Sequence, residues 1–553
     1  MNSNNKKSRV VIVMSFFLFI TVSAPAFEQE IKGEELGERG KFINAEIART
    51  LEDTENKDSI TLPLKLALGI ALENNLDIQT EKISIPISEK VIIEKDALFD
   101  PSLFGEFTNR RFEQQTSSAL SGTPIFKENE QHGKLGIRKL FRFGLEAETY
   151  IESGRYRDNS DFEGLDPQYK NFFIFSLRQP LLEDFGSDIN TTDINIAKND
   201  LKIMQNAFVS QAITTLNQVE ETYYDLSGSI ESLGLRKESL RLAEELLSDN
   251  RKRFKAGITH IGQVQEAETA VASRQEEVIA AHQEVKDVTN ILKNMLQIQA
   301  SSPLYPINFR TERLVPRDEK IPSVAEAYKK ALAKRPDYVQ KKIVVKNKDV
   351  LLKYRKNQLL PRLDLIGTFG LNGLSGEAEA ISFAGMSSKS PFGGGYGDSW
   401  DHLIDGDGYE WLIGLTIDIP LGNRADRSRY EQSNLDKKRA VMELKNLEDK
   451  IDLEIKVAME DIQSSLDRID VAEKFVSLAA TSLHQEEERM KEGLSDTFRI
   501  LIFQNGLIDA EIRKVRALVD YRKALARLYM AMGSNIERHD MALDFTNAKR
   551  SVQ

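Results

Sequence analysis

Few residues in this sequence have the types and spacing that catalysis or metal binding requires. The six histidines are scattered, and no two stand at the helical separation that lets a pair hold zinc. They are His132, His260, His282, His402, His484 and His539. Asp405-Gly406-Asp407-Gly408 begins like a calcium loop but lacks the other ligands, which favours a tight acidic turn. With no phosphate cradle and no nucleophile elbow either, we expect no enzyme activity, metal or cofactor.

The residues that do stand out occur twice, in the same order. Ala71 to Asp77 is echoed 260 positions later by Ala331 to Asp337. Farther along, Arg253-Phe254-Lys255-Ala256-Gly257 returns as Arg489-Met490-Lys491-Glu492-Gly493. Repetition at this scale indicates a duplicated supersecondary unit. Any function must therefore be something that two similar halves perform together.

Long stretches with the helical period lead up to these two glycines. From Leu201 to Leu233, and again from Ile451 to Leu483, apolar residues recur at every third or fourth position. Helices of about 50–70 residues are ~75–105 Å long. Helices of this length are typical of coiled-coil-like packing, whereas a globular domain has no need of them. Gly257 and Gly493 then supply the backbone freedom for a turn into a second helix. We predict two long helical hairpins.

Between two pairs of prolines the period changes from 3.6 to 2. Alternating segments lie between Pro101 and Pro180 in the first half, and between Pro361 and Pro420 in the second. Because proline resists both helix interiors and strand pairing, we expect these four residues to mark helix–strand transitions. Segments that are apolar on one face only are typical of transmembrane barrel strands. A soluble half-buried sheet has the same pattern and is the alternative.

The first 26 residues form a separate element. Lys6, Lys7 and Arg9 precede an apolar run that ends before Ala24-Pro25-Ala26, which is the pattern of a cleaved secretory signal peptide. Its removal subtracts three positive charges and takes the formal net charge from −11 to −14, a balance that disfavours nucleic-acid binding. The rest has no run of roughly 18 apolar residues and no cysteine for a lipid anchor or disulfide. If the mature chain enters a membrane, we expect it to do so as a β-barrel.

The order and spacing of these pieces resemble the TolC-type outer membrane efflux proteins over roughly residues 60–535. The pieces are Ala67 to Asp77, Gln179-Pro180-Leu181-Leu182, Arg253 to Gly257 with Val264-Gln265-Glu266-Ala267, and their second-half counterparts. The resemblance implies a mainly α protein with β structure, a duplicated unit of long coiled-coil-like helical hairpins plus strands. It also implies a homotrimer, in which each copy gives four main strands to a shared twelve-stranded outer-membrane β-barrel. The helices would form a periplasmic α-helical barrel.

A layout along the chain follows. It comprises a signal peptide at 1–26, an N-terminal periplasmic arm at 27–60, a first repeat at 61–300, a linker at 301–320, a second repeat at 321–535 and a C-terminal tail at 536–553. Barrel strands are expected at about 101–180 and 361–420, and hairpin tips near 257 and 493. The sheet region is longer in the first half, so we expect 142–151 to be an extra hairpin or a longer extracellular loop. The Gly- and Ser-rich segment 372–410 is expected to be an exposed loop.

The tip departs from the family pattern. Members often close it with tyrosine–aspartate–arginine links and an aspartate ring, whereas the corresponding positions here are Gln263, Met490, Ser495, Arg499 and Ile502. A narrowing formed by Asp496, Phe498 or Arg499 is the alternative. By resemblance, the grooves beside the tip glycines would dock a periplasmic adaptor. Tip, docking and gating roles are therefore assigned to Gly257, Gln263, Gly493, Ser495, Asp496, Phe498 and Arg499.

The function that the resemblance implies is passive conduction. The protein would be an outer-membrane exit duct, in contact with outer-membrane lipid and extending into the periplasm. It would receive substrates from an adaptor and an inner-membrane transporter, in efflux or in type I secretion. The alternative is a periplasmic coiled-coil scaffold or adaptor protein without a membrane pore.

Overall fold

The computed structural model describes most of the chain, in two compact units. The described residues are 59–116, 123–160, 163–298, 305–314, 319–383, 386–543 and 545. The predicted signal peptide, nearly all of the arm at 27–60, part of the linker and the end of the tail lie outside them. A β unit is formed by 90–199 and 346–438, and a helical unit by 59–89, 200–345 and 439–545.

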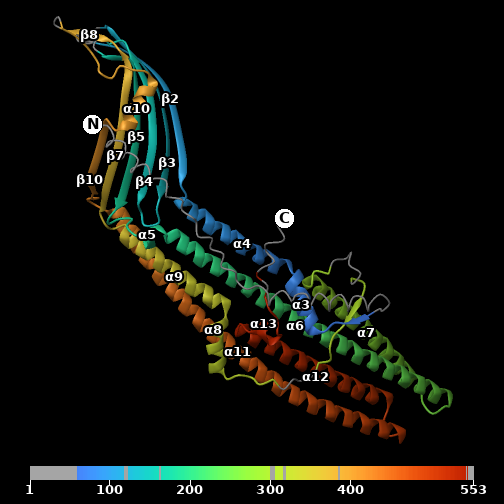
Figure 1. Ribbon diagram of the computed structural model, residues 1–553. Helices are drawn as coiled ribbons and strands as arrows, with labels where there is room; N and C mark the ends of the chain where they lie inside the picture. Colours follow the sequence, from blue (N-terminus) through green and yellow to red (C-terminus); the bar gives the residue numbers. More distant parts are fainter. Residues whose placement is uncertain are drawn as a thin grey trace. The chain divides into compact units, whose positions relative to one another are not determined.

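Six strands of the β unit form one antiparallel sheet in the order β10-β7-β5-β4-β3-β2 (Figure 1). The strands are β2 Ser102–Gln115, β3 Ile125–Leu140, β4 Glu146–Asp158, β5 Leu165–Pro180, β7 Arg362–Ala378 and β10 Gly408–Asp418. The only register shift among these ladders lies between Leu165 and Gln168 of β5. Since directly paired residues of an antiparallel sheet share a face, rows of side chains can be followed across all six strands.

The sheet contains two strands more than the four main strands per chain that the resemblance implied. The first repeat contributes β2 to β5 and the second contributes β7 and β10. The segment 142–151 leads into β4, which pairs with β3 and β5, so it extends the sheet and does not lengthen a loop. The sequence did not reveal β3 because five consecutive polar residues, 128–132, hide its period of 2.

The segment 372–410 is also not the exposed loop that was expected. Here β7 continues to Ala378, a small hairpin follows in β8 Ala380–Phe383 and β9 Met386–Lys389, and helix α10 Tyr396–Asp405 packs on β7 and β5. A Cβ added to Gly373 would lie only 1.9 Å from the carbonyl oxygen of Ser399. At this glycine, the small side chain reflects close packing beneath a helix and not exposure.

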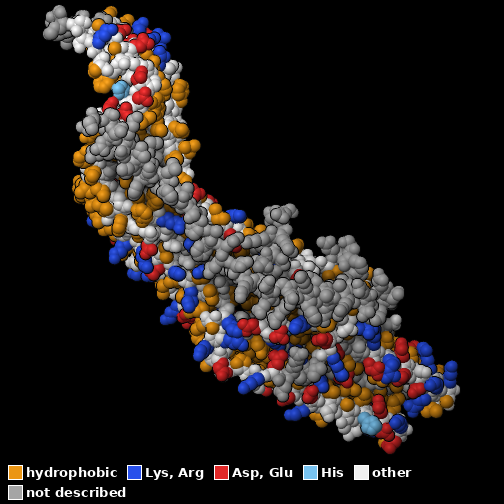
Figure 2. Space-filling view, in the orientation of Figure 1, with side chains coloured by type: hydrophobic (Ala, Val, Ile, Leu, Met, Phe, Trp, Pro, Cys, Tyr) orange, Lys and Arg blue, Asp and Glu red, His pale blue; other side chains and the backbone are white. Residues whose placement is uncertain are grey.

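The two faces of the sheet differ in chemistry. One row on the first face consists of Leu103, Ile137, Thr149, Phe175, Phe369 and Trp411. The adjacent row on the opposite face consists of Ser102, Arg138, Glu148, Ser176, Thr368 and Leu412. Large side chains of the apolar face are exposed in a single chain, for example Phe107 at 75% and Ile413 at 73%. Figure 2 shows hydrophobic side chains gathered along the strands and mixed charges over the helices.

The helical unit is dominated by two long hairpins, which confirms the periodicity prediction. Helix α6, Thr192–Lys255, has 64 residues and α11, Arg424–Lys491, has 68. Each is followed by a 35-residue helix, α7 Ile261–Met295 and α12 Thr497–Ala531. The shorter elements of the whole described chain, with η1 and α5 belonging to the β unit, are β1 Ser59–Thr61, α3 Leu64–Asn74, α4 Leu76–Asp96, η1 Ala97–Phe99, α5 Ser187–Asn190, β6 Asn308–Arg310, α8 Val324–Lys334, α9 Pro336–Asn357 and α13 Asn535–Arg538. None of the described helices is long and apolar enough to cross a membrane.

The echoed sequence at 71–77 and 331–337 encodes a repeated helix break. Helices α3 and α4 are separated at Asn75, as α8 and α9 are at Arg335. The backbone dihedrals φ and ψ are −64° and 124° at Asn75, and −64° and 121° at Arg335. Each N–H donates to the carbonyl of the alanine four residues earlier. The duplication is therefore visible in the backbone as well as in the sequence.

Each repeat also has its own buried cluster in the helical unit. The first gathers around Leu68, Tyr223 and Leu292, and the second around Ile455 and Leu525. These side chains come from the short helices and from both arms of the neighbouring hairpin. Burial of the apolar stripes explains why such long helices are stable, since helix propensity alone contributes little.

Candidate functional site

The two hairpin tips turn in the same way. Gly257 and Gly493 have φ of +74° and +77°, a left-handed region that L-residues disfavour by about 1–2 kcal/mol. Ile258 N–H donates to the Arg253 carbonyl over 2.9 Å, and Leu494 N–H donates to the Arg489 carbonyl over 2.8 Å. These bonds close both helices with the same C-terminal motif. The glycines are therefore required by the turn itself.

Polar side chains connect the first tip to the second. Asn250, fully buried on α6, donates through Nδ2 to the Thr497 hydroxyl over 2.8 Å and to the Gln263 carbonyl over 3.2 Å. The Gln263 side-chain oxygen accepts from Thr259 over 2.5 Å and from Thr497 over 3.4 Å. Thr497 is also fully buried and begins α12. One small network thus joins both hairpins beside their turns.

Arg274 forms a second set of hydrogen bonds between the two hairpins. Its guanidinium on α7 donates to the Ser239 carbonyl of α6 over 2.8 Å. It also donates to Gln504 Oε1 over 3.1 Å and to Asn505 Oδ1 over 3.0 Å, both on α12. Only 3% of the residue is exposed, and burial lowers the pKa of the guanidinium against the opposing effect of the Glu277 charge. A buried cation held by neutral oxygens fixes three helices at one point.

The second tip has its own carboxylate. Glu486 is 4% exposed on α11 and accepts from the Ser495 hydroxyl over 2.5 Å. Arg489 lies 3.6 Å from the carboxylate and Arg499 lies 3.9 Å from it. The Asp496 carboxylate caps α12 by accepting from the Arg499 backbone N–H over 2.9 Å. Both acidic groups therefore stabilise the turn of their own hairpin.

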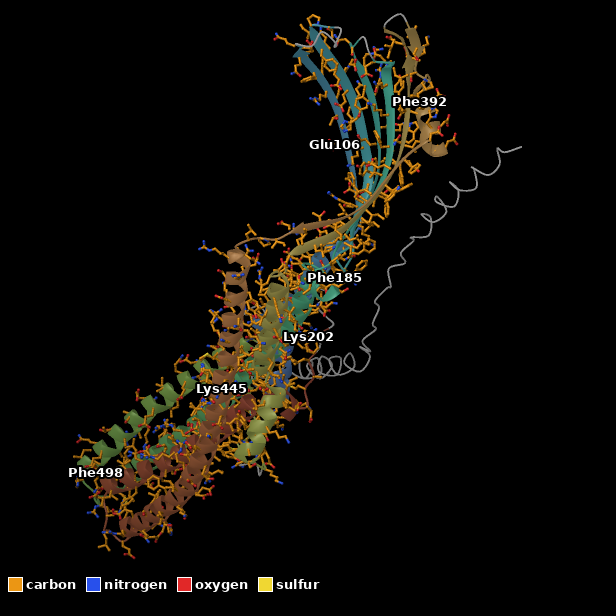
Figure 3. All side chains as sticks on the ribbon, turned by 90° about the vertical axis from the view of Figure 1, so that its left-hand side faces the viewer. Glu106, Phe185, Lys202, Phe392, Lys445 and Phe498 are labelled. Carbon is orange, nitrogen blue, oxygen red and sulfur yellow. The ribbon has the colours of Figure 1, made fainter. Side chains whose placement is uncertain are left out.

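The structure brings some of the predicted tip residues together and leaves others apart. Gln263 is within the network that joins the hairpins, while Ser495 and Asp496 bond within the second one. Phe498 lies at the tip and is 58% exposed in a single chain (Figure 3). Gly257 and Gly493 make the turns, so their assignment to adaptor docking remains a prediction.

Sequence reasoning missed the buried polar residues, although the spacing of 236 positions between the two tip glycines points to them. Asn250 and Glu486 each stand seven residues before a tip glycine, and both are almost fully buried. Thr259 and Ser495 each stand two residues after a glycine, and each donates its hydroxyl to an acceptor of its own hairpin. Comparing polar residues at equivalent positions of the two repeats is the signal that would have found them.

The four prolines lie at ends of strands. Pro101 and Pro361 directly precede β2 and β7, and Pro420 follows β10 before α11 begins at Arg424. Pro180 is itself the last residue of β5, and the short helix α5 comes before α6. Each proline thus stands where the period of the chain changes.

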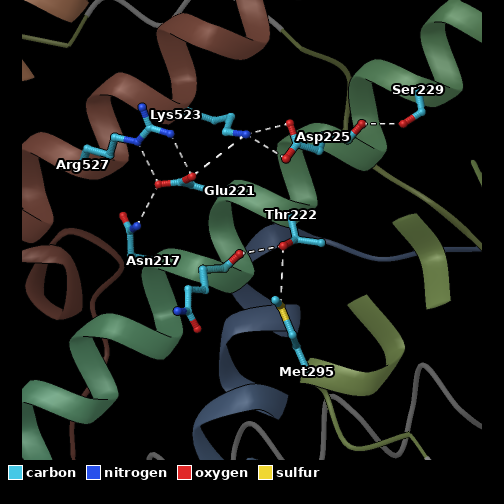
Figure 4. A network of polar contacts seen from close by, with 9 residues as sticks. Asn217, Glu221, Thr222, Asp225, Ser229, Met295, Lys523 and Arg527 are labelled. Atoms are coloured by element: carbon cyan, nitrogen blue, oxygen red, sulfur yellow. Dashed lines mark hydrogen bonds and ion pairs between the residues drawn. The ribbon is translucent and has the colours of Figure 1, made fainter. Parts of the chain in front are cut away.

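A charged cluster farther along the helices also joins the repeats, through α6 and α12 (Figure 4). Arg527 donates to both oxygens of Glu221 over 3.1 and 3.2 Å, and Lys523 donates to Asp225 over 2.8 and 2.9 Å. Asn217 donates to Glu221 over 2.9 Å. The hydrogen bond with Glu221, together with its charge, raises the pKa of Arg527 despite partial burial. Hydrogen bonds and ion pairs therefore join the two repeats both near the tips and farther along the helices.

Residues 148–296 match the family described as outer membrane efflux protein. The matched segment begins in β4 and includes β5, α6 and α7, and hence the first tip with Gly257 and Gln263. No curated protein matches this chain in sequence.

Solved structures share the fold over most of both chains. The Campylobacter jejuni CmeC outer membrane channel is 15% identical, with a TM-score of 0.59 and 88% of each chain covered. The outer membrane protein VceC from Vibrio cholerae is 15% identical, with a TM-score of 0.59, covering 85% of this chain and 96% of VceC. A membrane protein from Pseudomonas aeruginosa is 17% identical, with a TM-score of 0.59 and coverage of 85% and 90%. The predicted fold class, long helical hairpins with a β domain, is confirmed.

Proposed function

We propose that this chain, whose residues 148–296 match the outer membrane efflux protein family and whose fold is similar to that of CmeC and VceC, is a passive exit duct of the outer membrane. Three copies surround one pore, the sheets lie in the membrane and the long hairpins extend into the periplasm. An adaptor and an inner-membrane transporter deliver the substrate, so the duct itself needs no catalysis.

The sheet is the observation that carries this proposal. Its apolar face, with Trp411, Ile413 and Leu415 each 65% or more exposed, suits lipid contact. Its other face carries charged side chains such as Glu106 and Arg138, which suit a water-filled interior. A soluble scaffold would leave the apolar face of six strands in water, which monomeric soluble proteins rarely do.

Exposed apolar residues on α11 support association through the helices. They recur along one long helix of the single chain and include Leu435, Met442, Leu453, Val457, Val471, Phe475 and Leu478. A helix whose apolar residues extend beyond its contacts within the chain needs a further neighbour. A ring of hairpins from three copies supplies one, which is our reason to favour a homotrimer.

The tip is where we place closure and docking. In this proposal the network of Asn250, Gln263 and Thr497 holds the hairpins together in the closed state. The turns at Gly257 and Gly493 face the adaptor, and Phe498 with Arg499 borders the opening. The layout of signal peptide, arm, repeats, linker and tail given above belongs to the same proposal.

Membrane fractionation separates the duct from the scaffold alternative. We expect the full chain, expressed with its leader, to sediment with the outer membrane and to require detergent for extraction. In gels it should migrate as a trimer without heating and as a 62.6 kDa or slightly smaller chain after heating. A chain that remains in the soluble periplasmic fraction as a monomer would rule out the duct and leave the scaffold.

A further inference from the structure

The insertion of β3 and β4 changes the geometry of the sheet that the family fold places in the membrane. In the second repeat, β7 pairs directly with β10. In the first repeat, β2 follows Pro101 and β5 ends at Pro180, yet these two strands do not touch, because β3 and β4 lie between them. The inserted hairpin is hydrogen-bonded on both sides along its length. It is therefore part of the sheet.

The inserted strands carry the same two faces as their neighbours. On the apolar face, Leu135 and Ile137 of β3 and Ile151 of β4 are 59%, 48% and 44% exposed. On the polar face, Lys134 of β3 lies opposite Glu152 of β4. A hairpin outside the membrane would have no reason to keep an apolar face in register with β2 and β5.

Both edges of the six-stranded sheet are unpaired within the described residues. They are β2, with 14 residues, and β10, with 11. Every neighbouring pair in the sheet is antiparallel, so with six strands β2 and β10 run in opposite directions. Each edge strand has one apolar and one polar face, like the rest of the sheet. Phe107 on β2 and Trp411 on β10 belong to the apolar face. The two edge strands therefore have the opposite directions, the unpaired backbone groups and the matching faces that an antiparallel ladder between them requires.

We propose that β2 of one copy pairs with β10 of the next, so that all six strands of each chain form the wall. This rests on the proposed function, and with three copies the barrel has eighteen strands instead of twelve. Since barrel diameter grows roughly linearly with strand number, the pore through the membrane is about 1.5 times as wide as a twelve-stranded one. Barrels of about this strand number leave an open aqueous channel.

Cysteine cross-linking tests which strand meets β10, because the sequence contains no cysteine. Glu106→Cys lies on β2 at the edge of the sheet (Figure 3) and faces the polar side. It is combined in turn with Glu410→Cys, Leu412→Cys or Thr416→Cys on the same face of β10. The matched series replaces Glu106→Cys by Glu152→Cys on β4. Within one chain β4 and β10 are separated by two strands, about 14 Å, too far for a disulfide.

We expect oxidation of the Glu106→Cys series in outer membranes to shift the monomer band to covalent dimers and trimers at one β10 position, and the Glu152→Cys series to give none. Cross-links in the Glu152→Cys series would overturn the inference, because the wall would then end at β4 and contain four strands per copy. Absence of cross-links in both series, in protein that still conducts, would overturn it too. Uncross-linked chain that neither trimerises nor conducts would instead contradict the proposed function.

Discussion

Arg274→Leu should open the duct at its tip. The wild-type guanidinium fastens α6, α7 and α12 through Ser239, Gln504 and Asn505. Hydrogen bonds to a charged group contribute about 1.5–3 kcal/mol each, and the loss of even one such bond shifts a two-state equilibrium about tenfold or more. We expect the fraction of time spent in the high-conductance state to rise by at least about tenfold in single-channel recordings.

Two further variants make this result specific. Arg241→Leu also removes one positive charge, from α6, but among the described residues Arg241 pairs only with Glu238 and Glu245 of its own helix, so the conductance should stay at the wild-type level. Asn505→Ala removes one of the three acceptors and should give a smaller increase. If Arg274→Leu assembles normally and conducts like the wild type, the buried arginine does not hold the tip closed.

Glu220→Ala should be the most destabilising of the single substitutions. Glu220 is 1% exposed on α6 and lies 3.1 Å from Arg538 and 3.0 Å from His539, while the Tyr224 hydroxyl donates to it over 3.2 Å. Removing one partner of a buried pair costs about 3–5 kcal/mol, because the other charge is left uncompensated. Glu319, 3.2 Å from Arg538, compensates part of this. We expect a large decrease in the denaturant concentration at which the helical signal is lost.

The neighbouring residue is the matched control. Glu221 is 21% exposed and pairs with Arg527, whose side chain is 50% exposed, so Glu221→Ala should lower the free energy of unfolding by clearly less than Glu220→Ala does.

The stability of the wild type and of Glu220→Ala should also respond differently to acid. Burial raises the pKa of the Glu220 carboxyl, but His539, Arg538 and Tyr224 together outweigh this effect, and the net pKa is below its usual 4.5.

This shift gives the pH dependence a definite sign. A carboxyl whose pKa is lower in the folded than in the unfolded chain stabilises fully above its unfolded pKa. The stabilisation is lost as the pH falls below that value and through the lower pKa of the folded chain. Wild-type stability should therefore decrease below pH 4.5 more steeply than that of Glu220→Ala. Equal pH profiles, or equal losses for Glu220→Ala and Glu221→Ala, would show that the buried cluster contributes little.

The parts of the fold that repeat a simple period could be predicted, and the parts that depend on pairing could not. The long helices follow from apolar residues at every third or fourth position, and their turns from Gly257 and Gly493. Strand β10 follows from the strict alternation of apolar residues in the segment before Pro420. In contrast, the polar run 128–132 hides β3, and Gly373 gives no local sign of the helix above it.

At the tip, too, some residues could be predicted from the sequence and others could not. Gln263, Ser495 and Asp496 could be selected because they are close to the glycines in sequence. Arg274 and Gln504 could not, since they meet across 230 residues and a buried arginine resembles an exposed one in a heptad pattern. Burial of a long polar side chain depends on which neutral oxygens the neighbouring helices present, and this is a property of the packed structure.

Conductance of the purified wild-type protein in planar lipid bilayers tests the central claim most directly. The account predicts discrete steps of uniform size, each from one trimer, with low open probability in the absence of an adaptor. It also predicts that the Arg274→Leu variant opens more often in the same membrane. Protein that inserts as a trimer in either form but gives no steps would contradict the account of this chain as a duct.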